Sequence, residues 1–445
     1  MEPLPSSDLD TYASRYYGRG KIWRLQHIAS QSTKLRKEAL LLAIAETKAE
    51  TRDVDLYKRL VEQLRETEGD KGNIPLLQGE WETTVMREDS KEVERLETEL
   101  QRYRHNMIKD SIRMAYGDLG DFQYSKGNLE EALRNYLKMR DYCISSQQIT
   151  DMCLKVIQCA IILGNYSLVE SYVQKAEQTP DISTDEKTQA KLQCALGLAH
   201  LSKKKLKAAA ERFLQVSFAL QDSFNEIIAP EDVSTYGAIC ALATFDRKEL
   251  KRKLLDNKAF KEFLELTPNI RELVMDFYFC RYGKFFERLQ RTEPDWRLDL
   301  YFYSIVDMIM ECIRDKALVQ YVTPYTCVYL DEMAKVFCTD VVHLQDELAK
   351  LITSHQIEAR IDSHRKILYA TKEKRNSGDV WNDTIMRCNR FVDQAESMLL
   401  HLKMLKHRLS IRVASGMEQQ QQDHRSTAGR MDVISLNNNN NNRNE

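Results

Sequence analysis

The chain has 445 residues and a nearly balanced charge, with 65 Lys and Arg against 67 Asp and Glu. It contains only 15 Gly and 8 Pro, and because few turns imply long elements, this composition excludes a β-sandwich, a propeller or a collagen-like chain and favours helices. A net charge of −2 also argues against a protein whose main task is to neutralise phosphates, although local basic patches stay possible.

The ten cysteines include no C-x-x-C pair, which excludes zinc-ribbon and redox motifs. We expect reduced, mostly buried thiols in an intracellular protein. The first residues lack the basic and apolar regions of a signal peptide. The longest charge-free apolar stretch, residues 156–169, is too short and too polar to span a bilayer, so we expect no membrane partner.

Residues 1–110 are predicted to form an N-terminal helical region. Apolar residues recur there at helical spacing in several short runs. The polar, glycine-containing segment 69–79 predicts a mobile loop, and the highly charged segment 81–105 predicts a long helix with a narrow apolar stripe.

Residues 111–210 are predicted to form tetratricopeptide-like helical repeats. Small residues at Gly120 and Ala132 would let two antiparallel helices approach each other closely. The positions that match the tetratricopeptide pattern in its own spacing are Tyr116, Leu119, Gly120, Gly127, Ala132 and Tyr136. Turns between paired helices are predicted at residues 127–128, 164–165 and 203–205. We infer three degenerate repeats, which would stack into a right-handed solenoid.

Residues 211–372 are predicted to continue as helix pairs and to end in a winged helix at about 317–370. Three prolines, Pro230, Pro268 and Pro294, are expected at helix starts or between helices.

The winged helix itself is predicted from two helices and a hairpin. Thr323-Pro324 predicts the start of the first helix, and residues 341–352 the second. Strict alternation over 357–362 predicts a strand, and 366–370 a second strand, which together are the only strong strand signal.

Residues 380–412 are predicted to form one C-terminal helix. Its apolar positions number about three per heptad, more than a two-stranded coiled coil needs, so the pattern favours a bundle of several helices. The alternative is that this helix packs against the repeats of its own chain. The residues predicted to contact partner helices are Phe391, Met398, Leu399, Leu402 and Leu405. The Gln- and Asn-rich tail, 413–445, is expected to be disordered.

No sequence pattern supports catalysis or cofactor binding. The chain has no H-E-x-x-H metal site, no Walker loop and no nucleophile elbow. Gly18-Arg19-Gly20 resembles half of a dinucleotide loop, but no predicted strand precedes it. We therefore expect no enzyme activity, no cofactor and no metal.

Many winged helices bind DNA through their second helix. Here residues 341–354 carry Asp346, Glu347 and Lys350, a net charge of −1. A groove-reading helix presents Arg, Lys, Asn or Gln, and Gln345 and Lys350 alone are weak support for that role. Protein contact is therefore favoured over nucleic acid. The strand 357–362 could pair its edge with another chain, or it could be an ordinary hairpin strand whose charges face water. The strand residues predicted to contact a partner are Ile357, Glu358, Arg360 and Asp362.

An array of helical repeats that ends in a winged helix resembles a PCI domain, which is shared by subunits of the proteasome lid, the COP9 signalosome and initiation factor 3. Over residues 8–410 the chain is similar to the signalosome subunit 1 family, and less so to its paralogue in the proteasome lid. The segments that carry the resemblance are Met139–Cys143, Met152–Ile157, Ala241–Leu250, Phe263–Leu266 and Ala359–Ala370.

The resemblance implies a mainly α fold, in which a tetratricopeptide-like solenoid leads into the PCI domain and a bundle helix. It also implies a non-catalytic scaffold of a complex that removes a ubiquitin-like modifier from cullin–RING ubiquitin ligases, with the zinc protease in another subunit. The implied partners are other PCI and MPN subunits, in the nucleus and cytoplasm. The alternatives are a proteasome-lid PCI subunit, an initiation-factor-3-like subunit associated with RNA, and a free-standing enzyme.

Overall fold

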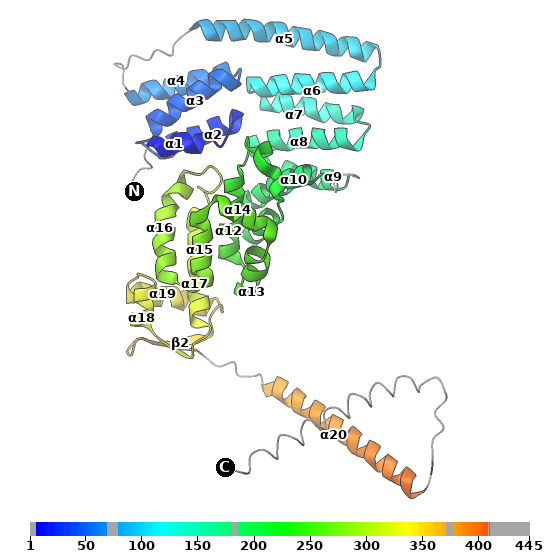
Figure 1. Cartoon of the computed structure of the whole chain (residues 1–445), viewed down its shortest axis with the longest axis vertical. Helices are drawn as coiled ribbons and strands as arrows, with labels where there is room; N and C mark the ends of the chain where they lie inside the picture. Colours follow the sequence, from blue (N-terminus) through cyan, green and yellow to red (C-terminus); the bar gives the residue numbers. More distant parts are fainter. Residues whose placement is uncertain (1–5, 69–78, 180–184, 371–376, 408, 410–445) are drawn as a thin grey trace. The chain divides into compact units, whose positions relative to one another are not determined.

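The structure, a computed structural model, describes residues 6–68, 79–179, 185–370, 377–407 and 409. Helices make up most of these residues, as the composition predicted (Figure 1). The chain divides into two compact units, residues 1–371 and 372–445. The loop predicted at 69–79 lies outside the described residues except for Gly79, and the predicted tail at 413–445 lies wholly outside them.

The first unit begins with helices that pack around a core of their own. Ile22, Ala39, Ile44 and Leu60 have at most 1% of their surface exposed there, which explains the helical spacing of apolar residues in this region. These helices are α1 (Ser6–Ala13), α2 (Gly18–Gln31), α3 (Arg36–Glu50) and α4 (Val54–Glu68). The long charged helix is α5 (Gly79–His105), whose buried Leu96 and Leu100 belong to the larger core of the repeats that follow.

Paired helices follow α5 and confirm the predicted repeat pattern. The pairs are α6 (Lys109–Lys126) with α7 (Leu129–Met139), α8 (Ser146–Ile162) with α9 (Tyr166–Glu177), and α10 (Glu186–Ser202) with α11 (Leu206–Phe213). A short 3-10 turn, η1 (Arg140–Tyr142), follows α7. Each pair turns where sequence patterns place it, through a left-handed residue: Gly127 (φ 97°), Gly164 (φ 70°) and Lys204 (φ 59°). Figure 1 shows α5, α6, α7 and α8 stacked as successive layers.

The contact between Gly120 and Tyr136 sets the spacing of α6 and α7. A Cβ atom at Gly120 would overlap the ring of Tyr136, which is 2% exposed and donates a hydrogen bond of 2.6 Å to Asp121. The ring is therefore buried and tied at its hydroxyl to the residue next to Gly120, so it cannot move aside without losing that hydrogen bond.

We expect Gly120→Ala to lower the free energy of unfolding by about 1–3 kcal/mol, because overpacking forces the buried ring or the backbone to shift. Gly117→Ala is the matched control on the same helix, since its nearest neighbour would be Met139 Sδ at an ordinary 3.7 Å. That variant should be neutral or slightly stabilising, because Ala is the better helix former. Thermal unfolding of both variants checks the prediction, and equal midpoints would contradict it.

Larger side chains fill the helices that come after the repeats. They are η3 (Phe218–Phe224), α12 (Pro230–Thr244), α13 (Arg247–Glu249), η4 (Leu250–Leu255), α14 (Lys258–Leu266), α15 (Pro268–Tyr278), α16 (Tyr282–Leu298) and α17 (Val306–Val322). Pro230 and Pro268 begin α12 and α15, as predicted. The prediction for Pro294 is wrong, because it lies inside α16. Pro294 cannot donate the usual backbone hydrogen bond within this helix. The buried side chains of Leu289, before it, and Trp296, after it, keep the helix packed on both sides of the missing bond.

A winged helix closes the first unit. Its elements are β1 (Cys327–Tyr329), α18 (Leu330–Val336), α19 (Val341–Thr353), β2 (Ala359–Asp362) and β3 (Ile367–Ala370). The strands form an antiparallel sheet in the order β1-β3-β2. The helix start predicted at Thr323-Pro324 is wrong: the helix begins at Leu330, and a strand precedes it. A strand of three residues is too short for alternation to reveal, and its pairing partner lies forty residues further on.

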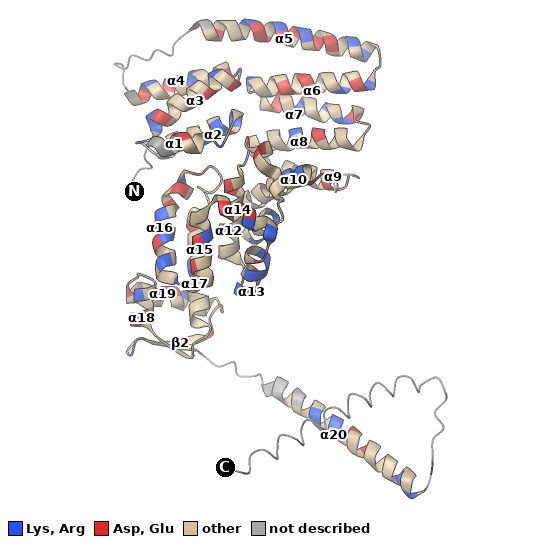
Figure 2. Ribbon diagram, viewed as in Figure 1, with Lys and Arg blue, Asp and Glu red and all other residues tan. Residues whose placement is uncertain are grey.

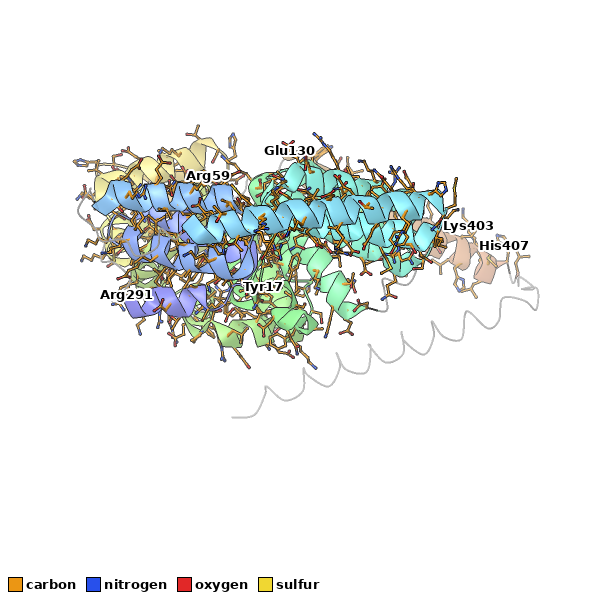
Figure 3. All side chains as sticks on the ribbon, turned by 90° about the horizontal axis from the view of Figure 1, so that it is seen from above. Tyr17, Arg59, Glu130, Arg291, Lys403 and His407 are labelled. Carbon is orange, nitrogen blue, oxygen red and sulfur yellow. The ribbon has the colours of Figure 1, made fainter. Side chains whose placement is uncertain are left out.

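The second unit contains α20 (Ser377–Lys406). The sequence predicted a helix over 380–412, so the observed helix starts earlier, and its described part ends at Lys406. Lys403, labelled in Figure 3, and Lys406 lie in its last turn, where positive charge stabilises a helix C-terminus.

Candidate protein-interaction surfaces

β2 lies at one edge of the winged-helix sheet and pairs only with β3 among the described strands. Of the predicted contact residues, Glu358 and Arg360 are exposed. Ile357 is only 6% exposed and packs in the core, while Asp362 accepts hydrogen bonds of 3.1 Å from the backbone N–H groups of His364 and Arg365. The strand therefore offers a backbone edge and two charged side chains, and its role as an interface stays a prediction.

The outer face of the same sheet carries aromatic residues that sequence patterns did not single out. Tyr369 pairs across the sheet with Cys327 on one side and Arg360 on the other. Tyr329 and Tyr369 are 58% and 40% exposed. The two tyrosines could be assigned to one face of the sheet only after β1 was known. The pairing of β1 with β3 sets which side chains of the two strands point to the same face.

The winged helix is fixed to the preceding helices by Arg314 of α17. Its Nε donates a hydrogen bond of 2.7 Å to Glu347 of α19, and its Nη2 one of 3.2 Å to Thr339. Its guanidinium also lies 5.5 Å from the centre of the Phe286 ring. Glu347 lies on the helix considered above for DNA reading, and it is occupied by this contact within the chain.

We expect Arg314→Ala to destabilise the winged helix by about 1.5–3 kcal/mol, because it removes a charged hydrogen bond to the largely buried carboxylate of Glu347 and a second one to Thr339. Amide hydrogen exchange in α19 and β2 should accelerate. The control is Arg291→Ala, which removes an ion pair of 2.6 Å whose two side chains, Arg291 and Glu287, are 74% and 62% exposed (Figure 3). An exposed pair contributes little, so exchange should not change there. Equal exchange in the two variants would refute the role of Arg314.

α20 carries the other set of predicted contact residues. Taken by itself, this helix leaves the predicted side chains exposed by more than half. The values are 72% for Phe391, 72% for Met398, 56% for Leu399, 61% for Leu402 and 63% for Leu405. They share one face of the helix, because residues three, four and seven apart lie together. Nothing in the structure assigns a partner to this face, so its role also stays a prediction.

A buried ionic cluster joins the N-terminal helices to the later helices of the first unit. Arg24, 2% exposed, donates hydrogen bonds of 2.9 Å to Asp232 and 3.0 Å to Asp299. The hydroxyls of Tyr16 and Tyr236 donate to the same two carboxylates at 2.8 Å. Burial raises the pKa of Asp232 to about 6, although Arg24 acts in the opposite direction. Sequence patterns gave no sign of this cluster.

Within the described ranges, no group of three or more His, Cys, Asp and Glu residues is arranged to hold a metal ion. In the same part of the chain, no helix combines the length and apolar character needed to cross a membrane.

Helical repeats that lead into a winged helix define the class of PCI-domain proteins. The PCI domain pattern matches residues 284–372, and that of the 26S proteasome subunit RPN7 matches residues 78–253. Two relatives named as subunits 1 and 1b of the COP9 signalosome are 43% and 34% identical to this chain over more than nine-tenths of its length. The chain therefore belongs to the COP9 signalosome subunit 1 family, as its resemblance to that family implied.

Relatives in two organisms illustrate this membership, and a proteasome subunit of a third organism gives the contrast. COP9 signalosome complex subunit 1 of Arabidopsis thaliana is 43% identical over 417 residues, which cover 93% of this chain and 92% of the relative. Subunit 1b of the same complex in Drosophila melanogaster is 34% identical, over 92% of this chain and 87% of the relative. The 26S proteasome non-ATPase regulatory subunit 6 of Dictyostelium discoideum is only 24% identical, over 71% and 80%. The prediction that the proteasome paralogue is less similar is thereby confirmed.

Proposed function

We propose that this chain is a non-catalytic scaffold subunit of a COP9 signalosome, and that it supports the removal of a ubiquitin-like modifier from cullin–RING ubiquitin ligases. The observation that carries the proposal is its likeness, over nearly the whole length, to proteins named as subunit 1 of that complex. A scaffold needs surfaces for several neighbours. The free edge of β2 suits pairing with a strand of another subunit, and the apolar face of α20 suits a bundle of helices.

The chemistry of the complex is assigned to other chains in this proposal. We infer that a different subunit carries the protease activity and that this chain contacts PCI and MPN subunits. The cullin–RING ligases would then be substrates of the assembly rather than of this chain. We also infer that the complex works in both the nucleus and the cytoplasm.

A subunit of the proteasome lid is the second candidate, because the RPN7 pattern covers residues 78–253. The higher identity to signalosome relatives favours the first candidate. An RNA-associated role has less support. The outward side chains of α19 include Val342, His343, Asp346 and Lys350, which give no excess of positive charge for phosphates.

Purification of the tagged full chain from its native cell, followed by mass spectrometry of its companions, tests the proposal. We expect the other signalosome subunits and cullin–RING ligases in the eluate. Recovery of proteasome lid subunits in their place would support the second candidate. A salt-sensitive affinity of the purified full chain for single-stranded RNA, without protein companions, would contradict both.

A further inference from the structure

A small apolar groove lies on the helices that precede the winged helix. It is bounded by η4, α14 and α15 and has a volume of about 290 Å³. Two of its lining residues, Leu264 and Val274, are 4% and 0% exposed and form its buried floor. The residues that line it nearer the surface are Met275, Tyr278 and Phe279. We call it the α14–α15 groove.

Two of these residues leave much apolar surface uncovered. Met275 is 37% exposed and Phe279 is 52% exposed. Single exposed apolar residues are ordinary on a protein surface. Here they gather around a hollow with a buried aliphatic floor, which is typical of a surface that another molecule covers.

Positive side chains surround the groove. Lys261 and Arg271 line it directly, together with one acidic residue, Glu265. The guanidinium of Arg247 lies 5.1 Å from the centre of the Tyr278 ring, and that of Arg281 lies 5.5 Å from the Phe279 ring. The cations therefore contact the same aromatic residues that line the groove.

Most of this positive charge is not compensated within the chain. Among the described residues, Arg247, Lys261 and Arg271 form no ion pair with a carboxylate, and Arg281 approaches Asp276 only at 3.8 Å. Arg247 donates a hydrogen bond of 3.1 Å to Cys280 Sγ, which is not a charged partner. An incoming carboxylate can therefore approach these cations without breaking an existing ion pair.

The run of residues from α13 into η4 extends this positive surface. Lys251 lies one helical turn after Arg247, whose guanidinium contacts the Tyr278 ring. It also lies one turn before Leu255, which lines the groove. Figure 2 shows Lys and Arg gathered in this segment, beside the α13 label. The basic surface is thus continuous with the groove.

We propose that the α14–α15 groove binds a segment of a partner protein in which one or two bulky apolar side chains are flanked by Asp and Glu residues. The apolar side chains enter the hollow, and each one buried contributes about 1.5–3 kcal/mol. The carboxylates face Arg247, Lys261 and Arg271, which selects for an acidic segment and speeds its association.

Two other kinds of ligand fit the groove less well. Sites for drug-sized molecules enclose about 300–1,000 Å³, so this hollow suits a side chain or two better than a cofactor. Single-stranded RNA stacks its bases on open aromatic rings. The Tyr278 ring already carries Arg247, and the floor is aliphatic.

The test uses the purified full chain and an array of short synthetic peptides in which Phe and Leu stand among Glu and Asp residues. Fluorescence anisotropy should detect peptides that bind at micromolar concentration. Peptides with Ser in place of Phe and Leu, or with Lys in place of Glu and Asp, should not bind. Met275→Glu in the protein should weaken binding by about tenfold or more, because a carboxylate replaces part of the apolar wall and repels the peptide.

Charge reversal separates the proposal from non-specific attraction. The double variant Lys261→Glu with Arg271→Glu should lose the acidic peptides and gain affinity for the Lys-containing ones. Both residues are exposed, so the fold should persist, as circular dichroism can verify. The control is Arg134→Glu on α7, whose side chain is 70% exposed and pairs with Glu130 at 3.8 Å; it should bind like the wild type. Absence of binding across the array, equal binding by all variants, or stronger binding of a uridine oligonucleotide at the same residues would overturn the proposal.

Discussion

Replacing Arg24 with Met should lower the free energy of unfolding by about 3–5 kcal/mol, which is the usual effect of removing one partner from a buried ion pair. The volume of the side chain is largely kept, so the loss comes from electrostatics. Asp232 and Asp299 would remain buried while losing the guanidinium that lies 2.9 Å and 3.0 Å from them. Tyr16 and Tyr236 can still donate to these carboxylates, but neutral hydroxyls do not balance two negative charges. Chemical denaturation of the full chain measures the effect.

The pH dependence of this loss identifies its cause. Burial already raises the pKa of Asp232 to about 6 in the folded protein, and removal of Arg24 takes away an influence that lowers it. A carboxyl whose pKa is raised by folding binds its proton more tightly in the folded state, so acidification favours folding until the pH falls below the unfolded value of about 4. The deficit of Arg24→Met should therefore be largest above about pH 7 and smaller near pH 5.

Neutral partners supply the control. Adding Asp232→Asn and Asp299→Asn to Arg24→Met removes the unpaired charges, and part of the lost stability should return. The free energy of unfolding of Arg24→Lys should lie between those of the wild type and Arg24→Met. A single ammonium group keeps the positive charge but cannot place two separate donors as the guanidinium does. A deficit that does not change with pH, or that the two Asn substitutions enlarge, would argue for lost packing instead.

The cluster around Arg24 could not be predicted from the sequence, unlike the helix pairs. The helix pairs were predictable, because Gly120, Ala132 and Tyr136 lie within one local pattern whose spacing reflects one contact. Arg24 and Asp232 are 208 residues apart, and nothing near either residue indicates its partner. β1 was missed for a related reason, since its three residues are specified by pairing with β3 rather than by their own alternation. Local periodicity thus predicted the helices, whereas contacts between residues far apart in the sequence could be identified only from the structure.

The candidate surfaces divide in the same way. The apolar face of α20 follows from a heptad pattern within a single helix, so Phe391, Met398 and Leu405 could be selected from the sequence. The α14–α15 groove could not be selected, because α15 carries apolar residues on several sides. Only packing decides that Phe277 is buried while Met275 and Phe279 are not.

Replacement of Met398, Leu399 and Leu402 by Asp should abolish incorporation of this chain into its complex while residues 1–371 stay folded. If these side chains are buried in a bundle, each contributes about 1.5–3 kcal/mol to association, and three buried carboxylates oppose it further. A loss of about 4 kcal/mol already weakens association about a thousandfold. The first unit should be unaffected, because α20 belongs to a separate compact unit. Native mass spectrometry of the purified complex, with circular dichroism of the free chain, measures both outcomes.

A matched control separates the apolar face from the helix as a whole. Substitution of Asn389, Arg390 and Ser397 by Asp adds the same number of carboxylates to the same helix. None of these residues is three, four or seven positions from a predicted contact residue, so they lie away from the face of Phe391 and Met398. This variant should assemble normally. An intact complex that contains the first triple variant would contradict the bundle hypothesis. A free chain whose α20 amides are protected from exchange, and lose that protection in the first triple variant alone, would show instead that the apolar face packs against the helices of its own chain.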